Sequence, residues 1–491
     1  MPAYPGFCGP DNVTQSALAD GQRTVNWYIE LAEAPGATAQ LALYPTPGVS
    51  VVATASDAPG RGAIACDGRL FCVIGSTVYE LDVVTSTLTA RGTVAVDSNP
   101  ATLTWNGDGG GQVFITSGDN GYIFDLDSNV FSQVRTGATS MGAHLDGYFL
   151  ALDAATSTIW LSNLLDGTTW DPTQFAQRSI ASDPWVSMAV LDRYLWLLGT
   201  ETSEVWYDAG AYPFPFTPHP SGLVQYGCAA AFSPRVVSGA LLWLGRTKDG
   251  AETVLQVQGF TPEPVSSFAV SSALGGYTTV SDARGDSYQQ LGHTFYLLTL
   301  PTAGVTWAYD VTPSLQLPPP LRWAERGTWL VDESRYDAWR PLFHVYLGAT
   351  HYVLDRTSGS VYTLSSSHLR DVDGRAIRRL RVPPSLYADN EWLRVWEFQL
   401  LLDVGLGAVT GQGSTPQVAL RISTDGGRTY GVERWRSAGA LGNYDTRVRW
   451  LRCGMGRRWT PEIVVSDPVP WRLLGATVTV EQSDAGSGGM R

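Results

Sequence analysis

The sequence predicts an all-β protein with a six- or seven-bladed β-propeller, a C-terminal β-sandwich-like module and an N-terminal arm. Three observations lead to this fold class: a hairpin unit that recurs through the middle of the chain, strand-like segments after it, and weak helical periodicity throughout. Hydrophobic residues make up 44% of the 491 residues and charged residues 16%, as is typical of a globular protein. The 52 glycines and 29 prolines predict many tight turns between short strands.

The recurring unit lies between about residues 70 and 366. Each copy has a short apolar strand, a turn rich in Gly, Ser or Asp, and a second strand with an aromatic residue, as in LFCVI-GST-VYELD at 70–82. The second strands begin at Val78, Ile123, Ile159, Val205, Val254, Val305 and Val361, so the spacings are 45, 36, 46, 49, 51 and 56 residues. Propeller blades need ~40–50 residues each. Radial stacking of blades buries the sheet faces that a single hairpin leaves exposed. The alternative architecture is a set of β-sandwiches, which also give short strands at regular spacing.

The propeller is expected to span residues 46–366 and to end near SSSHLRDVDGR at 365–375. A β-rich platform module is expected over 367–482, where EWLRVWEFQLLLDVGLG reads as a buried strand and RVRWLRCG alternates Arg with apolar residues. Residues 1–45 show few features of the repeat, and we expect this arm to pack on the C-terminal module. The tail at 483–491 is expected to be flexible.

The stretch STDGGRTY at residues 423–430 has the spacing of an Asp-box turn. The Asp-Gly-Gly step suits positive φ angles, and the Ser423 and Asp425 side chains can accept hydrogen bonds inside the turn. Thr429 and Tyr430 are expected to start the return strand. The predicted structural turn therefore comprises Ser423, Asp425, Gly427, Thr429 and Tyr430, and it supplies no nucleophile, base or metal ligand.

The charge and the motif content of the sequence argue against several classes of function. The net charge of −13 argues against a generic nucleic-acid binder, but the charge is uneven: residues 368–491 hold 17 Arg and 13 acidic residues, or +4, which leaves −17 for residues 1–367. The five cysteines lack a CxxC pair and the six histidines lack an HExxH pair, so we expect no metal or cofactor. No run approaches ~20 apolar residues, so no membrane span is expected.

An arginine cluster stands at the start of the C-terminal module, in HLRDVDGRAIRRLRVPP. Its members are Arg370, Arg375, Arg378, Arg379 and Arg381. These guanidinium groups are candidates for contact with a neighbouring subunit's carboxylates or with DNA phosphates. The alternative is a solvated strand face with local ion pairs.

Several stretches resemble the packaged-DNA stabilisation proteins of short-tailed bacteriophages, which are also described as tail accessory factors, tail hubs or nozzles. In the C-terminal module the matching residues are Asp425, Gly426, Gly427, Tyr430, Gly431, Tyr444, Arg447, Val448, Trp450, Gly454 and Arg457. Near the start they are Val25-Asn26-Trp27-Tyr28 and Thr46-Pro47-Gly48; in the middle they are Ser162-Asn163-Leu164, Asp183, Gly199, Glu204-Val205-Trp206 and Gly227. The resemblance therefore runs from about residue 20 to residue 480.

This resemblance implies a structural virion protein of the phage tail, assembled in the host cytoplasm, and not an enzyme. It implies a homo-oligomeric ring, a hexamer, that lies below the portal and adaptor proteins and above tail-tip, needle, fibre or spike proteins. The ring would extend the channel through which double-stranded DNA passes, retain the packaged genome and open for ejection. An acidic bore would suit that role, since each cation facing the duplex adds a phosphate contact.

Two other functions remain open from the residues alone. A receptor- or glycan-binding propeller would use aromatic loops such as AYPFPFTP at 211–218 to stack on sugars. A sialidase-like glycoside hydrolase would need two suitably separated carboxylates, which the sequence does not locate, and repeated Asp-boxes, of which one good copy stands outside the propeller.

Overall fold

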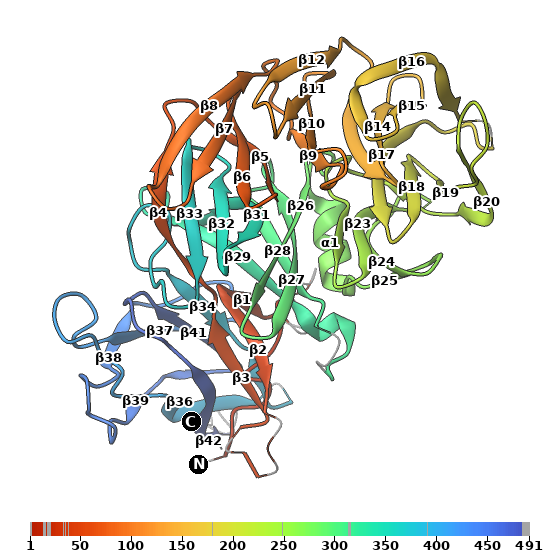
Figure 1. The fold of residues 1–491 in the computed structure, drawn as a ribbon. Helices are drawn as coiled ribbons and strands as arrows, with labels where there is room; N and C mark the ends of the chain where they lie inside the picture. Colours follow the sequence, from red (N-terminus) through yellow and green to blue (C-terminus); the bar gives the residue numbers. More distant parts are fainter. Residues whose placement is uncertain are drawn as a thin grey trace.

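A computed structural model describes residues 2–12, 16, 21–32, 34, 36–37, 39–178, 180–247, 249–312, 316–389 and 391–483. Within these residues the chain is nearly all β, with one α-helix, α1 (Phe268–Gly276), and one 3-10 turn, η1 (Pro319–Arg322). Figure 1 shows an arc of small sheets above a second β-rich body formed by the C-terminal strands.

Six small antiparallel sheets and the first four strands of an eleven-stranded sheet form the seven blades of a propeller, numbered 1 to 7 in chain order from residue 60. Blade 1 has β5 (Gly60–Cys66), β6 (Arg69–Ile74), β7 (Thr77–Asp82) and β8 (Thr87–Thr93), and blade 2 has β9 (Thr102–Trp105), β10 (Gln112–Ser117), β11 (Asn120–Asp125) and β12 (Phe131–Arg135). Blade 3 has β13 (Met141–Leu145), β14 (Tyr148–Asp153), β15 (Thr158–Asn163) and β16 (Asp166–Gln177). Blade 4 has β17 (Trp185–Leu191), β18 (Tyr194–Gly199), β19 (Ser203–Asp208) and β20 (Phe216–Val224).

Blades 5 to 7 complete the circle. Blade 5 has β21 (Gly227–Cys228), β22 (Arg235–Val237), β23 (Ala240–Arg246), β24 (Glu252–Gln258) and β25 (Thr261–Pro264). Blade 6 has β26 (Arg284–Gln290), β27 (His293–Leu300), β28 (Val305–Asp310) and β29 (Trp323–Leu330), with β30 (Arg335–Ala338) paired to β29. Blade 7 has β31 (Pro341–Leu347), β32 (Thr350–Asp355), β33 (Ser360–Ser365) and β4 (Gly48–Thr54).

The ring closes with a strand from the start of the chain. β4 is the outermost strand of blade 7 and pairs antiparallel with β33, with Val49 opposite Leu364 and Ala53 opposite Val361. The first strands of neighbouring blades contact one another in circular order, from β5 through β31 and back to β5. β4 therefore supplies the fourth strand of blade 7, and the start of the chain completes the last blade of the ring.

The repeated apolar hairpins lie at the middle of each blade, and their side chains fill the spaces between blades. Phe71 and Val113 belong to a buried cluster between blades 1 and 2, and Leu150 and Trp185 to one between blades 3 and 4. The turns within these blades use local chemistry, because Asp146 and Gly147 both have positive φ, at 50° and 88°. That conformation matches the twist of a two-residue hairpin.

The C-terminal body is a sandwich of two sheets that includes strands from the N-terminal arm. One sheet has the order β2 (Trp27–Leu31), β3 (Leu41–Pro45), β42 (Leu473–Ser483), β36 (Trp392–Leu402) and β39 (Val448–Leu451), with β40 (Met455–Gly456) paired to β36. The other has β1 (Arg23–Val25), β34 (Arg379–Val382), β41 (Arg458–Val465), β37 (Gln417–Ser423) and β38 (Arg434–Ser437), with β35 (Leu386–Tyr387) paired to β41. In Figure 1 the red β1–β3 lie beside the blue C-terminal strands.

A single aromatic-rich core lies between the two sheets of the sandwich. Trp27 from the arm, Phe398 from β36 and Trp459 from β41 belong to one buried cluster. The Phe398 and Trp459 ring centroids are 5.6 Å apart, and Tyr4 of the arm stands edge-on to Phe398 at 6.0 Å. Aromatic burial of this kind supplies much of the energy of a β-sandwich core.

Strand β1 joins the propeller to the sandwich. Val25 pairs in parallel with Glu325 of β29 in blade 6, while β1 pairs antiparallel with β34, so that one sheet of eleven strands runs through both bodies. The next residue, Asn26, is buried at φ 61°. Its side-chain amide donates to the carbonyls of Gly327 (2.8 Å) and Arg378 (2.9 Å), and its oxygen accepts from the Gly327 N–H (3.0 Å).

These features confirm the predicted fold class, and the described residues form seven blades. The second strand of every predicted hairpin is the third strand of its blade, except in blade 5, where it is β24, the fourth of five. The structure adds α1, which follows β25 and was not expected, with Ser267 accepting from the Val270 N–H at its N-terminus. The predicted domain limits stay predictions, and 484–491 of the predicted tail lie outside the described residues.

Replacing Asn26 with Ala is expected to lower the free energy of unfolding by about 3 kcal/mol or more, because three buried backbone groups lose their partner. Asn26→Gly should cost less than Asn26→Ala by about 1 kcal/mol, since glycine accepts the positive φ without strain. Urea unfolding followed by tryptophan fluorescence measures both. The matched control is Asn129→Ala, at an exposed position with φ 56°, where the loss should be small. Equal losses at the two sites would contradict the role given to Asn26.

Candidate subunit and DNA contact sites

The structure does not gather the five predicted arginines into one surface. Arg370 and Arg375 lie in the loop between β33 and β34 and are exposed, whereas Arg379 and Arg381 on β34 are fully buried. Arg378, just before β34, is half-buried. Alternation along the strand sends Arg379 and Arg381 to the same side.

Arg381 uses its guanidinium to hold the N-terminal arm. It donates to the carbonyls of Phe7 (2.6 Å), Gly6 (2.9 Å) and Pro10 (3.2 Å). It also donates to the Thr24 hydroxyl (2.7 Å) and to the Gln22 side-chain oxygen (2.8 Å). Burial lowers the pKa of Arg381 to about 10, so the group stays charged at neutral pH.

Arg379 and Arg378 also face inward. Arg379 donates to the carbonyls of Ile377 and Thr46, both at 3.3 Å, and lies 5.8 Å from the centroid of the Trp27 ring. The Arg378 guanidinium lies over the ring of Trp329 in blade 6, at 4.3 Å from its centroid. A buried guanidinium that stacks on a ring and bonds to carbonyls stabilises the contact between elements.

The prediction for the cluster therefore needs correction at Arg379 and Arg381. Neither reaches the surface, and neither sits on a solvated strand face, because β34 lies between β1 and β41 within the sandwich. The exposed members bond locally: Arg370 donates to the Gly374 carbonyl (2.8 Å), and Arg375 pairs with Asp373 at 3.5 Å. Contact with a neighbouring subunit or with DNA stays a prediction for Arg370, Arg375 and Arg378.

The Asp-box-like turn is built as a self-contained network. Asp425 accepts from the N–H groups of Arg428 and Thr429, both at 3.0 Å, and from the Thr429 hydroxyl at 2.6 Å. The Ser423 hydroxyl donates to Asp425 (2.6 Å) and accepts from the Gly427 N–H (2.8 Å). Hydrogen bonds from Ser423 and Thr429 hold the pKa of Asp425 well below its usual range.

The expectation that Thr429 and Tyr430 start the return strand is wrong. The return strand, β38, begins at Arg434, and residues 424–433 form a wider loop. Tyr430 turns back to the sheet, where the Arg421 guanidinium lies 5.3 Å from its ring centroid. The physical reason is that Asp425 bonds to residues 428 and 429, which bends them away from an extended conformation.

A histidine links the propeller to the arm at a place that the sequence analysis did not single out. His293, at the start of β27, contacts Asp310 of β28 through Nδ1 (2.6 Å) and Glu30 of β2 through Nε2 (3.0 Å). Tyr28 and Phe295 flank its ring. Burial alone would lower the pKa of His293, but hydrogen bonds and charges from Asp310 and Glu30 outweigh it and raise the pKa above its ordinary value. No local sequence pattern connects residues so far apart.

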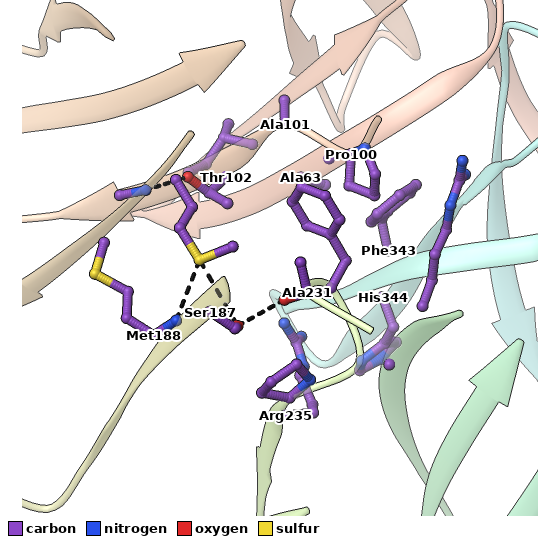
Figure 2. A pocket seen from close by; sticks show the side chains of 18 residues that line it. Ala63, Pro100, Ala101, Thr102, Ser187, Met188, Ala231, Arg235, Phe343 and His344 are labelled. Carbon is purple, nitrogen blue, oxygen red and sulfur yellow. Dashed lines mark hydrogen bonds between the residues drawn. The ribbon is translucent and has the colours of Figure 1, made fainter. Parts of the chain in front are cut away.

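The centre of the propeller holds a cavity of about 180 Å³ lined by residues from the first strands of all seven blades and the loops beside them. Figure 2 shows the Ser187 hydroxyl donating to the Ala231 carbonyl (2.6 Å), with the Met141 sulfur accepting from the Met188 N–H (3.2 Å). Burial, with His351 and Arg235 nearby, lowers the pKa of His344 to about 3. None of these contacts places a general base beside the Ser187 hydroxyl, so we interpret the hydrogen bonds of Ser187 as structural.

Neither a metal site nor a membrane-spanning helix is found among the described residues. These residues contain no group of three or more His, Cys, Asp or Glu side chains placed to hold a metal ion. Over the same residues, no helix is both long and apolar enough to cross a bilayer.

Comparison with known proteins first gives the class. The protein is a β-propeller followed by a β-sandwich, and two family models cover these parts in order. The model described as the β-propeller of bacteriophage P22 Gp10 matches residues 22–369, and the one described as the β-sandwich of bacteriophage P22 Gp10 matches residues 378–481.

The chain therefore belongs to the bacteriophage P22 Gp10 family of packaged-DNA stabilisation proteins, as the sequence resemblance predicted. It is a structural component of a phage virion.

Solved structures with similar folds are distant. The N-terminal domain of Nup159 is 11% identical, with a TM-score of 0.40 over 70% of this chain and 98% of that one. PorZ, of the type-IX secretion system of Porphyromonas gingivalis, is 12% identical, with a TM-score of 0.36 over 72% of this chain and 45% of that one. A search of curated protein sequences gave no match.

Arg381→Met is expected to lower the free energy of unfolding by about 3 kcal/mol or more, because buried carbonyls of the arm lose their donors. Arg375→Met, at the exposed end of the same cluster, should change it by less than about 1 kcal/mol. Chemical unfolding of the two variants measures the difference. Similar small losses would show that Arg381 does not anchor the arm.

His293 predicts a pH dependence whose sign follows from its raised pKa. The stabilisation that the charged His293 ring gives the folded protein is complete below the pKa of histidine in the unfolded chain, about 6.5. It is lost as pH rises through the higher pKa of His293 in the folded protein. The wild-type protein should therefore lose stability above neutral pH, and His293→Gln should flatten this slope. His219→Gln, whose ring lies among Tyr194, Tyr207 and Phe260, is the control. Thermal melts across this pH range give the slopes, and an unchanged slope in His293→Gln would refute the assignment.

Proposed function

We propose that the protein is the tail hub, or nozzle, of a short-tailed phage. Six copies form a ring below the portal and adaptor proteins, extend the DNA channel, retain the packaged genome and open for ejection. The ring assembles in the host cytoplasm and contacts tail-tip, needle, fibre or spike proteins on its other side. The observation that carries this proposal is the match of both domains, in order, to the Gp10 family.

The build of the subunit supports a mechanical role. A protein that holds a channel closed must carry load between its domains without unfolding. Here one sheet continues from blade 6 through β1 into the sandwich, and the Arg23 guanidinium adds two hydrogen bonds to Glu325, at 2.9 and 2.8 Å. The Val25–Glu325 backbone pair and the ion pair beside it thus join the two domains directly.

The charge of the chain also suits a channel through which DNA must slide. Residues 1–367 carry a net charge of −17, so acidic groups outnumber cations in this part of the chain and on balance repel the phosphates of a duplex. Each phosphate contact that is avoided weakens non-specific binding.

The aromatic loop that favoured a glycan-binding propeller is mostly folded inward. Phe216 is 2% exposed and packs edge-on to Tyr148, and Phe214 lies against Phe216 with ring centroids 5.9 Å apart. Tyr212 alone projects, at 93% exposure. One exposed ring is a weak platform for stacking on a sugar. The loop therefore does not favour a glycan-binding function over the tail-hub function.

Purified protein mixed with an isolated portal–adaptor complex is expected to add one six-fold ring to it, as seen by cryo-electron microscopy. The same protein should bind free duplex DNA weakly at 150 mM salt, because an acidic propeller gains little from counterion release. A protein that stays monomeric with the connector, or binds a glycan array, would overturn the proposal.

A further inference from the structure

The outer face of one sandwich sheet exposes large apolar side chains in a row. Trp396 of β36 is 44% exposed, Leu451 of β39 is 50% exposed and Met455 of β40 is 38% exposed. The register brings them together: Leu451 stands opposite Glu397, next to Trp396, and Met455 stands opposite Arg394. Exposed aromatic and aliphatic side chains gathered on one rigid sheet face mark an interaction site.

Arginines surround this row. Arg449 of β39 stands opposite Gln399 of β36, and Arg447 donates to the Gln399 oxygen at 2.6 Å. Both arginines also lie near the Glu397 carboxylate, Arg449 at 3.6 Å and Arg447 at 3.9 Å. Arg394 lies 5.3 Å from the Trp396 ring centroid, and the Trp396 indole donates to Glu481 at 2.8 Å. We call this surface the Trp396 face; it comprises Arg394, Trp396, Arg447, Arg449, Leu451 and Met455. Tryptophan and arginine are the side chains that most often dominate binding energy at interfaces.

The edge of the same sheet is closed to strand addition. Arg434 of β38 donates to the Leu451 carbonyl at 2.6 Å, and Arg436 donates to the Arg449 carbonyl at 3.1 Å. The outer carbonyls of β39 therefore already have donors from the other sheet. A partner must meet the face of the sheet and not its edge.

A second surface with exposed apolar side chains and nearby acidic residues lies on the propeller. Leu164 and Leu165, in the turn between β15 and β16, are 56% and 41% exposed. Leu165 is held by neighbouring turns: its N–H donates to the Gly147 carbonyl (2.8 Å), and its carbonyl accepts from the Asn106 amide (3.4 Å). The apolar centre is thus fixed in place.

Exposed aspartates stand in turns of blades 2 and 4, on either side of blade 3. Asp108 lies in the turn between β9 and β10, Asp127 in the turn between β11 and β12, and Asp192 in the turn between β17 and β18, all exposed. Asp166 follows Leu165 directly. The nearby Arg193 is paired with Asp146 at 3.1 Å, so these two charges cancel. We call this surface the Leu164 patch; it comprises Asp108, Asp127, Leu164, Leu165, Asp166 and Asp192.

The two surfaces lie on different domains of one chain. In Figure 1 the sandwich strands β36 and β39 are at one end of the molecule and blades 2 to 4 at the other. A contact between two different surfaces of identical chains is head-to-tail, and it produces a ring when the rotation closes.

We propose that the Trp396 face of one copy binds the Leu164 patch of the next copy, and that this contact forms the ring. The inference rests on the proposed ring function and specifies its interface. The apolar centres bury each other, and Arg447 and Arg449 meet Asp108 and Asp127 at the rim. Complementary charge sets the register of such a contact and suppresses alternatives.

A charge swap tests the proposal. Arg447→Glu with Arg449→Glu, and separately Asp108→Arg with Asp127→Arg, should each raise the concentration needed for ring formation by about 100-fold. All four substitutions in one chain should restore the ring, because each reversed surface then meets a reversed partner. Sedimentation velocity and cryo-electron microscopy on the portal–adaptor complex measure assembly. Arg375→Glu, at an exposed arginine outside both surfaces, is the matched control.

The outcomes separate this interface from the ring itself. Each double variant should stay folded, since every substituted residue is at the surface. Loss of the ion pairs to Glu397 should lower the melting temperature of the Arg447→Glu, Arg449→Glu variant only slightly. Trp396→Ala should weaken assembly without any change of charge. Normal rings from both double variants, or folded monomers from the fourfold variant, would overturn the interface while leaving the ring function intact. A wild-type protein that forms no ring on the connector would instead overturn the proposed function.

Discussion

The architecture depends on one short strand in an unusual place. β1 brings Asn26 between the sixth blade and the sandwich, where its amide satisfies backbone groups of Gly327 and Arg378 at once. Because each of these groups is buried, no water can replace the asparagine without a cost. The arm that follows then serves both bodies: β2 and β3 extend a sandwich sheet, and β4 closes the propeller. Two domains that are separate in sequence thus become one body.

Buried arginines also hold the arm and the two domains together. Their charge alone wrongly predicts that they lie at the surface. The cluster at 370–381 looked like a surface because arginine is seldom buried, yet Arg381 bonds to five groups of the arm. Arginine suits the position because its planar fork offers five donors and stays charged when buried. The two-residue spacing of Arg379 and Arg381 is the one local signal that both point to the same side of a strand.

Local chemistry explains which parts of the fold the sequence predicts. The inner hairpins of every blade are predictable because apolar strands and turns rich in Gly, Ser or Asp leave a pattern within about ten residues, as at Gly75 between β6 and β7. The partners of β4, the junction at Asn26 and the contact of His293 with Glu30 join residues more than 250 positions apart, and no local pattern records them. The Trp396 face and the Leu164 patch appear only when the register aligns their members.

The central claim is that β1 makes the propeller and the sandwich one cooperative unit. Native-state hydrogen exchange of the Asn26 and Gly327 amides tests it most directly, since these bond to the Glu325 carbonyl and the Asn26 side chain at 3.0 Å. The account predicts that both amides exchange only through global unfolding, with the same protection as the inner strands of the blades. Exchange of these two amides at the rate of exposed turns, while blade amides stay protected, would contradict it.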